Sequence, residues 1–176
     1  MLRAALALSL TLPLLFAAPL WAGEPRELAW LEMLPADAAE AAPPAALHDL
    51  SKLADVLSSE SGPAASQQSA AAPVVKALDG QWVKLPGYIV PLNSSEEGRV
   101  TEFLLVPYYG ACIHVPPPPP NQIVHVKTEL GVLMDNLYQP FWIEGPLKVE
   151  SISSDIAEAG YQMEASKVYP YESPEN

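Results

Sequence analysis

The sequence contains a single cysteine, Cys112, among its 176 residues. One cysteine cannot close a disulfide within the chain, so a small fold stapled by disulfides is excluded. In an oxidising compartment, Cys112 must therefore be a buried apolar residue, a metal ligand or a reactive thiol. Burial is the simplest of the three interpretations, because free cysteines are among the most buried residues in proteins.

Positive charge is also scarce. The chain has 9 Lys and Arg residues against 21 Asp and Glu residues, which gives a formal net charge of −12 at pH 7. A surface of this sign repels polyanions and offers no basic patch for a phosphate backbone. Nucleic acid is therefore excluded as a partner.

Long apolar segments are confined to the N-terminus, where Arg3 is followed by a mostly apolar run from Ala4 to Leu15 and a small residue stands at Ala22. This layout predicts a cleavable signal peptide over residues 1–22, cut after Ala22. No later segment approaches the roughly 20 apolar residues that a bilayer requires. We therefore expect a periplasmic or secreted protein with no membrane span after the signal peptide is removed.

Proline, by contrast, is abundant, with 20 residues, and helps to divide the chain into regions. Apolar residues at helical spacing predict a short amphipathic helix over Arg26–Leu34, ended by Pro35, and a second helix over Leu47–Leu57. The remainder of 36–73 is rich in Ala, Pro and Ser, a composition that predicts a flexible linker. Residues 23–73 are thus expected to be helical segments joined by a linker.

From residue 74 to residue 170, Val, Ile, Leu and aromatic residues alternate with turn residues, which predicts successive short strands. The expected strands are 81–92, 99–106, 108–115, 122–130, 140–152 and 160–168. Pro86 and Gly87 indicate a bend in the first of them, and Ser153 to Ala159 is expected to form one helical turn. The predicted fold is mainly β, a small five- to six-stranded OB-like barrel with short N-terminal helices, with a split sandwich as the alternative. Residues 171–176 are a tail.

One segment carries most of the chemistry, because Cys112 and His114 lie next to five consecutive prolines. If 109–115 and 122–126 pair as a hairpin around the prolines, Val115 faces Gln122 and Cys112 faces His125, on the same side as His114. Thiolate and imidazole ligands at this spacing suit zinc, and equally copper. The alternative is an ordinary strand whose cysteine is apolar core. A one-residue shift of register would turn His125 to the other face.

A second hypothesis treats the same segment as a docking surface, because polyproline presents a preordered ligand to a partner. Tyrosines flank the prolines, and an amide pair follows them. Tyr88 and Trp142 are further aromatic residues that either line a groove or belong to the core. The predicted ligand or partner surface consists of Tyr108, Tyr109, Pro117, Pro118, Pro119, Asn121 and Gln122.

Three stretches carry a family resemblance: Leu85–Leu92, the block Glu102–Gln122, and the strand Phe141–Gly145. In these stretches the chain resembles the DUF3299 family of small exported bacterial proteins, which has no established activity. The resemblance covers about the last 100 residues and, more loosely, the segment Trp30–Leu34. The insert 36–73 is longer than the family pattern.

The resemblance implies an accessory role in transport, because similar proteins are often encoded beside ABC transporter components, sometimes in gene clusters that respond to zinc limitation. We therefore expect a periplasmic protein that binds a zinc-like metal through Cys112, His114 and His125 and works with an inner-membrane ABC transporter. Two alternatives remain open. One is an interaction module that uses the polyproline loop, and the other is a thiol-dependent enzyme with Cys112 as nucleophile.

Overall fold

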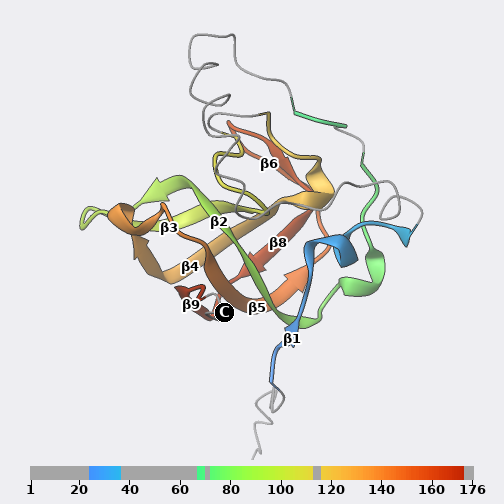
Figure 1. Ribbon diagram of the computed structural model, residues 1–176, viewed down its shortest axis with the longest axis horizontal. Coiled ribbons are helices and arrows are strands. Elements are labelled where there is room, and N and C mark those ends of the chain that lie inside the picture. The colour runs from blue at the N-terminus through green and yellow to red at the C-terminus, as the bar shows by residue number, and fades with distance from the viewer. Residues whose placement is uncertain (1–23, 37–66, 70–71, 113–115, 173–176) are drawn as a thin grey trace, which may run out of the picture.

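The computed structural model describes residues 24–36, 67–69, 72–112 and 116–172 (Figure 1). The predicted signal peptide and the predicted helix over 47–57 lie outside these residues. Within the described residues, no helix has the length and apolar character needed to cross a membrane. The described strands are β1 Arg26–Glu27, β2 Trp82–Ser94, β3 Arg99–Val106, β4 Val124–Leu133, β5 Phe141–Lys148, β6 Ile152–Ser153, β7 Glu158–Ala159, β8 Tyr161–Glu164 and β9 Lys167–Pro170.

Five of these strands close into a barrel. The order is β2, β3, β4, β8, β5, and β5 pairs back onto β2. The pairing of β4 with β8 is parallel, and the other four pairings around the barrel are antiparallel. The structure thus confirms a mainly β chain with a closed five-stranded barrel. Strands β1 and β9 extend the sheet beyond the barrel, while β6 and β7 form a separate hairpin.

Closure depends on a bend in β2, which has 13 residues. Residues Trp82 to Gly87 pair with β5, and residues from Tyr88 onward pair with β3. The bend falls at Pro86 and Gly87, as the sequence predicts. Proline and glycine interrupt a regular ladder, since the first lacks an amide hydrogen and the second lacks a side chain.

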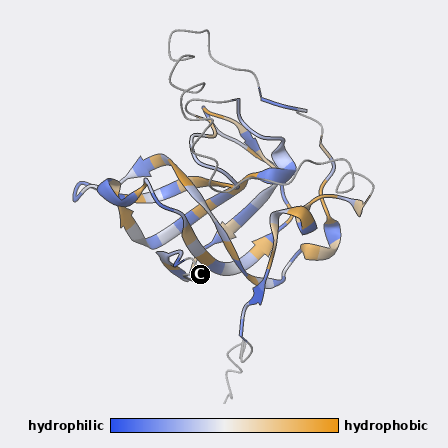
Figure 2. Cartoon of the chain, viewed as in Figure 1, coloured by the Kyte–Doolittle hydropathy of each residue, from blue (hydrophilic) through white to orange (hydrophobic). Residues whose placement is uncertain are grey.

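The barrel interior is an apolar core formed by alternate residues of the strands, which appear as alternating bands in Figure 2. Side chains at successive positions of a strand point to opposite faces, so every second residue reaches the core. A second apolar cluster, which we call the outer apolar cluster, lies outside this core, between the outward side of β2 and β3, the loop between β3 and β4, and the β6–β7 hairpin. Its buried members are Tyr88, Val90, Leu104, Val106, Ala111, Ile123, Ala157 and Ala159.

The N-terminal helix predicted over Arg26–Leu34 is wrong. Arg26 and Glu27 form β1, which pairs in parallel with β2, and only Trp30–Met33 form a 3-10 turn. Contacts with the barrel override the weak helical preference of so short a segment. The Trp30 indole N–H donates to the Pro86 carbonyl at 2.6 Å, and Leu28, Trp30 and Met33 are buried in the main core.

The helical turn predicted over Ser153–Ala159 is also wrong, because this segment is the β6–β7 hairpin with Ile152 opposite Ala159. Ser154 stabilises the connection between the two strands. Its hydroxyl accepts from the backbone N–H of Ala157 at 3.1 Å and donates to the Ala157 carbonyl at 2.7 Å. A serine that bonds local backbone groups favours turns as readily as helix ends.

Tyr161 joins three distant segments. Its side chain is fully buried in β8. Its hydroxyl donates to the Met33 carbonyl at 2.8 Å and accepts from the Val75 N–H at 2.8 Å. One phenol therefore attaches both the Trp30–Met33 turn and the segment before β2 to the barrel.

We expect Tyr161→Phe to destabilise the fold by about 1–3 kcal/mol, because two backbone groups lose their buried hydrogen-bond partner while the ring remains. Urea unfolding of the purified variant measures this change. The matched control is Tyr138→Phe, whose ring is 68% exposed and whose unfolding midpoint should stay close to the wild type. Equal midpoints for both variants would show that the Tyr161 hydroxyl does not secure these segments.

Candidate functional site

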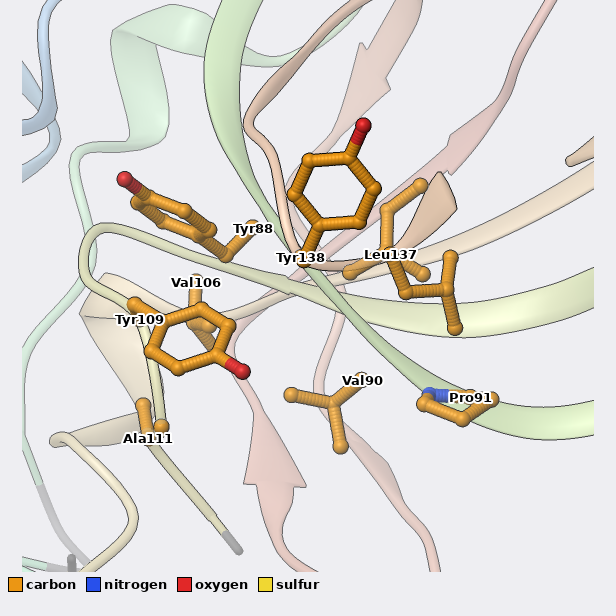
Figure 3. Close-up of a pocket in the computed structure, with 10 residues that line it drawn as sticks. Tyr88, Val90, Pro91, Val106, Tyr109, Ala111, Leu137 and Tyr138 are labelled. Atoms are coloured by element: carbon orange, nitrogen blue, oxygen red, sulfur yellow. The ribbon is translucent and has the colours of Figure 1, made fainter. Parts of the chain in front are cut away.

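A pocket of about 200 Å³ opens on the outward side of the barrel, beside the bend of β2. Three separate segments build it: the second half of β2, the loop between β3 and β4, and the connection between β4 and β5. Figure 3 shows the side chains surrounding the hollow. The lining residues are Tyr88, Ile89, Val90, Pro91, Val106, Tyr109, Gly110, Ala111, Leu137 and Tyr138.

Three tyrosines dominate this lining. Tyr88 is buried, whereas Tyr109 and Tyr138 are 49% and 68% exposed. The rings of Tyr88 and Tyr109 meet edge to face, with centroids 5.6 Å apart and an interplanar angle of 70°. Burial, and secondarily the neighbouring Tyr109, raises the pKa of Tyr88, so its hydroxyl keeps its proton at neutral pH. The site therefore offers neutral aromatic rings with polar tips.

The lining of the pocket is mostly apolar. Among the described residues that line the pocket, none carries a carboxylate, imidazole, amine or thiol. Small-molecule pockets commonly enclose about 300–1,000 Å³. A hollow of about 200 Å³ is smaller, and it suits one or two side chains of a partner.

A polar row crosses the same outward side of the barrel, next to the apolar cluster. Glu102 on β3 accepts from the Asn93 amide at 2.6 Å and lies 2.9 Å from the His125 Nε2. The Lys127 amine is 3.5 Å from the same carboxylate. The Asn93 hydrogen bond, together with Lys127 and His125, lowers the pKa of Glu102 against the opposing effect of burial. Glu102 is therefore ionised at neutral pH and balanced by its neighbours.

The predicted strand register around the prolines is wrong. His125 pairs with Leu104 of β3, and Cys112 does not lie opposite it in the ladder. Cys112 sits in a turn with φ of +66° and packs against the outer apolar cluster. The structure describes residues 108–112 of the strand predicted over 108–115, and these residues do not form a strand. Gly110, with φ of +79°, helps to turn the chain away from an extended path.

The metal set of Cys112, His114 and His125 stays a prediction, because His114 lies outside the described residues. Among the residues that are described, no group of three or more His, Cys, Asp or Glu side chains is placed to hold a metal ion. The imidazole of His125 is 4% exposed and bonded to Glu102. The structure therefore brings His125 together with the Glu102 carboxylate, 2.9 Å away.

The proline run is packed into the fold. Pro117, Pro118 and Asn121 are buried, and Pro119 and Gln122 are partly buried. These burials do not fit an exposed docking surface at Pro117, Pro118 and Asn121. Each carbonyl of the run from the second proline onward receives a donor, at distances between 2.7 and 3.1 Å. The pairs are Gln68 N–H to Pro117, Gln67 Nε2 to Pro118, Gln122 N–H to Pro119 and Gly160 N–H to Pro120.

The amides after the prolines also act inside the fold. The Asn121 side chain donates to the Pro73 carbonyl at 2.8 Å, and the Gln122 side chain donates to the Trp30 carbonyl at 2.9 Å. Of the predicted partner surface, Tyr109 is the member that is both largely exposed and part of the pocket. Tyr108 is partly buried beside it.

Sequence reasoning missed Leu137 and Tyr138, which complete the pocket from the β4–β5 connection. The available signal for this part of the pocket was Tyr138, an aromatic residue in a short connection between strands. No periodic pattern in the sequence indicates that Tyr138 lies near β2. Trp142, the other aromatic residue considered for a groove, lies on another side of the sheet. There the Lys84 amine stands 4.7 Å from its ring centroid, and Tyr171 packs against it.

Comparison with known proteins supports one family. The family model described as "Protein of unknown function (DUF3299)" matches residues 30–170. A crystal structure of a DUF3299 family protein from Pseudomonas aeruginosa PAO1 is 66% identical, covers 87% of this chain and 100% of that chain, and superposes with a TM-score of 0.71. No curated protein matches the chain. The chain therefore belongs to the DUF3299 family.

Proposed function

We propose that this chain is an exported binding protein whose tyrosine pocket holds a proline-rich segment of a partner protein. The observation that carries the proposal is the meeting of Tyr88, Tyr109 and Tyr138 around a small apolar hollow. Aromatic grooves of this kind bind polyproline segments, because a segment that is already extended loses little entropy on docking. Proline rings match a hollow the size of one or two side chains.

The polar tips of the tyrosines add direction to such binding. A proline-rich segment has carbonyl acceptors but few amide donors. A tyrosine hydroxyl at the rim can donate to such a carbonyl while its ring packs against the proline. The net charge of −12 favours a segment flanked by basic residues, because complementary charge raises the rate of association.

The barrel itself is consistent with a binding role, and we assign it to the OB type. Its longest strand, β2, pairs with two neighbours, and one parallel pairing, between β4 and β8, joins the third barrel strand to the last. OB barrels bind extended ligands across their second and third strands and adjoining loops. In this chain those strands are β3 and β4, whose connecting loop carries Tyr109.

The partner that we propose is a component of an inner-membrane ABC transporter, as the family resemblance implies. Such a partner requires that the chain be exported, which the signal-like residues 1–22 favour. A zinc or copper site at Cys112, His114 and His125 is a separate proposal. It requires that Cys112 give up its proton, because metals bind the thiolate.

A thiol-dependent enzyme is disfavoured by the surroundings of Cys112. Burial raises the pKa of its thiol to about 11. At pH 7 about one thiol in ten thousand would then be ionised. Catalytic cysteines instead have a lowered pKa, from a cation or a helix N-terminus nearby.

For the pocket, we expect Tyr109→Ala and Tyr138→Ala each to weaken binding of a decaproline peptide with one arginine at each end by about tenfold, or about 1.4 kcal/mol. Loss of an aromatic anchor removes most of its contact with a proline ring. Titration followed by amide chemical shifts measures affinity and locates the peptide. Tyr171→Ala is the matched control, since Tyr171 packs on Trp142 and does not line the pocket. A peptide whose shifts avoid the pocket, or whose affinity survives both substitutions, would overturn the proposal.

For Cys112, the rate of alkylation by iodoacetamide should rise about tenfold per pH unit from pH 7 to pH 10, without a plateau. The reason is that the thiolate is the reacting species and its fraction grows until the pH reaches the pKa of about 11. A plateau near pH 7 or 8 would instead identify an activated thiol and would support the thiol-dependent enzyme hypothesis.

For localisation, full-length protein expressed in a Gram-negative host should be recovered from the periplasmic fraction with Gly23 as its first residue. Cleavage after Ala22 follows from the small residue that ends the apolar segment. Edman sequencing of the recovered protein checks the cut. Recovery from the cytoplasm with an intact N-terminus would contradict export.

A further inference from the structure

A short segment far from the pocket in sequence bears on the loop that builds it. Gln67, Gln68 and Ser69, which we name the strap, lie against the proline run and the β6–β7 hairpin. The Gln67 carboxamide donates to the Pro118 carbonyl at 3.1 Å and to the Glu158 carbonyl at 2.7 Å. Its oxygen accepts from the Glu158 N–H at 2.9 Å. One amide side chain thus bonds two segments of the fold.

The strap contacts both described parts of the β3–β4 loop, which are the outgoing limb, residues 107–112, and the returning limb, residues 116–123. The backbone N–H of Gln68 donates to the Pro117 carbonyl on the returning limb at 3.1 Å. The Gln68 side chain is hydrogen-bonded to Tyr108 on the outgoing limb, where it opposes the rise in the Tyr108 pKa that burial causes. Tyr108 directly precedes Tyr109, which lines the pocket. Tyr108 therefore connects the strap to the pocket, because it bonds Gln68 and directly precedes Tyr109.

The proline run needs this strap for a chemical reason. Consecutive prolines have no amide hydrogens, so their buried carbonyls must find donors elsewhere in the fold. The carbonyls of Pro119 and Pro120 receive donors from Gln122 and Gly160, which belong to the barrel and its adjoining turns. Those of Pro117 and Pro118 receive donors from the strap.

The contacts that join the strap to the other described residues are hydrogen bonds. Gln68 and Ser69 are exposed, Gln67 is partly buried, and none of the three has an apolar side chain to pack into a core. A segment with exposed hydrogen bonds and little apolar burial belongs to the low-stability part of a protein and opens without global unfolding.

From these contacts we propose that the strap is a latch, in which Gln67 anchors the strap to Pro118 and Glu158 and Gln68 holds Tyr108, so that Tyr109 is placed in the pocket. Gln67 is a positioning residue, since it acts through the loop and does not line the pocket. Release of the latch leaves the barrel intact and lowers the fraction of molecules with a formed pocket. The effect on the loop is independent of the proposed function, whereas the effect on peptide affinity rests on it.

Cys112 provides a direct reporter, because it is partly buried in the same loop. At pH 8, Gln67→Ala should raise the rate of Cys112 alkylation by iodoacetamide at least tenfold. Gln67→Glu should do the same, because a carboxylate keeps the bond from the Glu158 N–H but faces the carbonyls of Pro118 and Glu158. The matched control is Gln81→Ala, whose amide bonds Arg26 and Ala77 and should leave the rate unchanged.

Amide hydrogen exchange separates a latch from a general loss of stability. In Gln67→Ala, the Gly160 amide, which donates to Pro120 across the proline run, should exchange at least tenfold faster, while the Leu104 amide in the barrel should not change. Equal acceleration at both amides, or an unchanged alkylation rate in Gln67→Ala, overturns the latch.

The peptide titration then distinguishes the two proposals. The decaproline peptide should bind Gln67→Ala about tenfold more weakly, because the apparent affinity falls with the fraction of competent molecules. If the wild type does not bind the peptide but Gln67→Ala accelerates alkylation and Gly160 exchange, the latch stands and the proposed function fails. If the wild type binds and Gln67→Ala leaves alkylation unchanged, the latch fails and the pocket stands.

Discussion

Closure of the barrel depends on the close approach of β2 to the end of β3 at Gly87. A Cβ atom at this position would stand 2.8 Å from the Val106 carbonyl oxygen and 2.9 Å from the Leu105 Cγ, so only glycine fits without displacement. The preceding Pro86 contributes its carbonyl to the Trp30 indole. The same bend that closes the barrel therefore fixes the N-terminal turn and, one residue later, directs Tyr88 into the pocket.

The outward side of β2, β3 and β4 is graded in polarity. Tyr88 and Val106 stand opposite each other at the pocket end, and Asn93 and Glu102 stand opposite each other at the other end. Between them lies the buried Leu104, beside His125. The partly exposed carboxylate of Glu102 is surrounded by the Asn93 amide, His125 and Lys127, which stabilise its charge. The pocket end is apolar, and it is there that the surface remains hollow.

The barrel could be predicted from the sequence because strand periodicity is local. Arg99–Val106 is a strand with the predicted bounds, and the bend at Pro86 and Gly87 follows from what those residues lack. The pattern failed at Cys112, where alternation suggested a strand but positive φ values at Gly110 and Cys112 make a turn. The pocket could not be predicted, since Tyr88, Tyr109 and Tyr138 come from three segments that only the tertiary fold brings together. The Gln67 contacts could not be predicted for the same reason. Pro118 lies 51 positions from Gln67 in the sequence, and Glu158 lies 91 positions from it.

The parallel pairing of β8 with β4 has a consequence for the order in which the chain folds. β8 is the last barrel strand in the sequence, and it inserts between β4 and β5, which come before it. Until residues 161–164 are available, those two neighbours have unpaired edges and the core remains open to water. Such non-local pairing forms slowly, because the chain loses the entropy of loop closure before the stabilising contacts between distant strands are made. The barrel of a nascent chain can therefore close only after almost all of the chain has been synthesised.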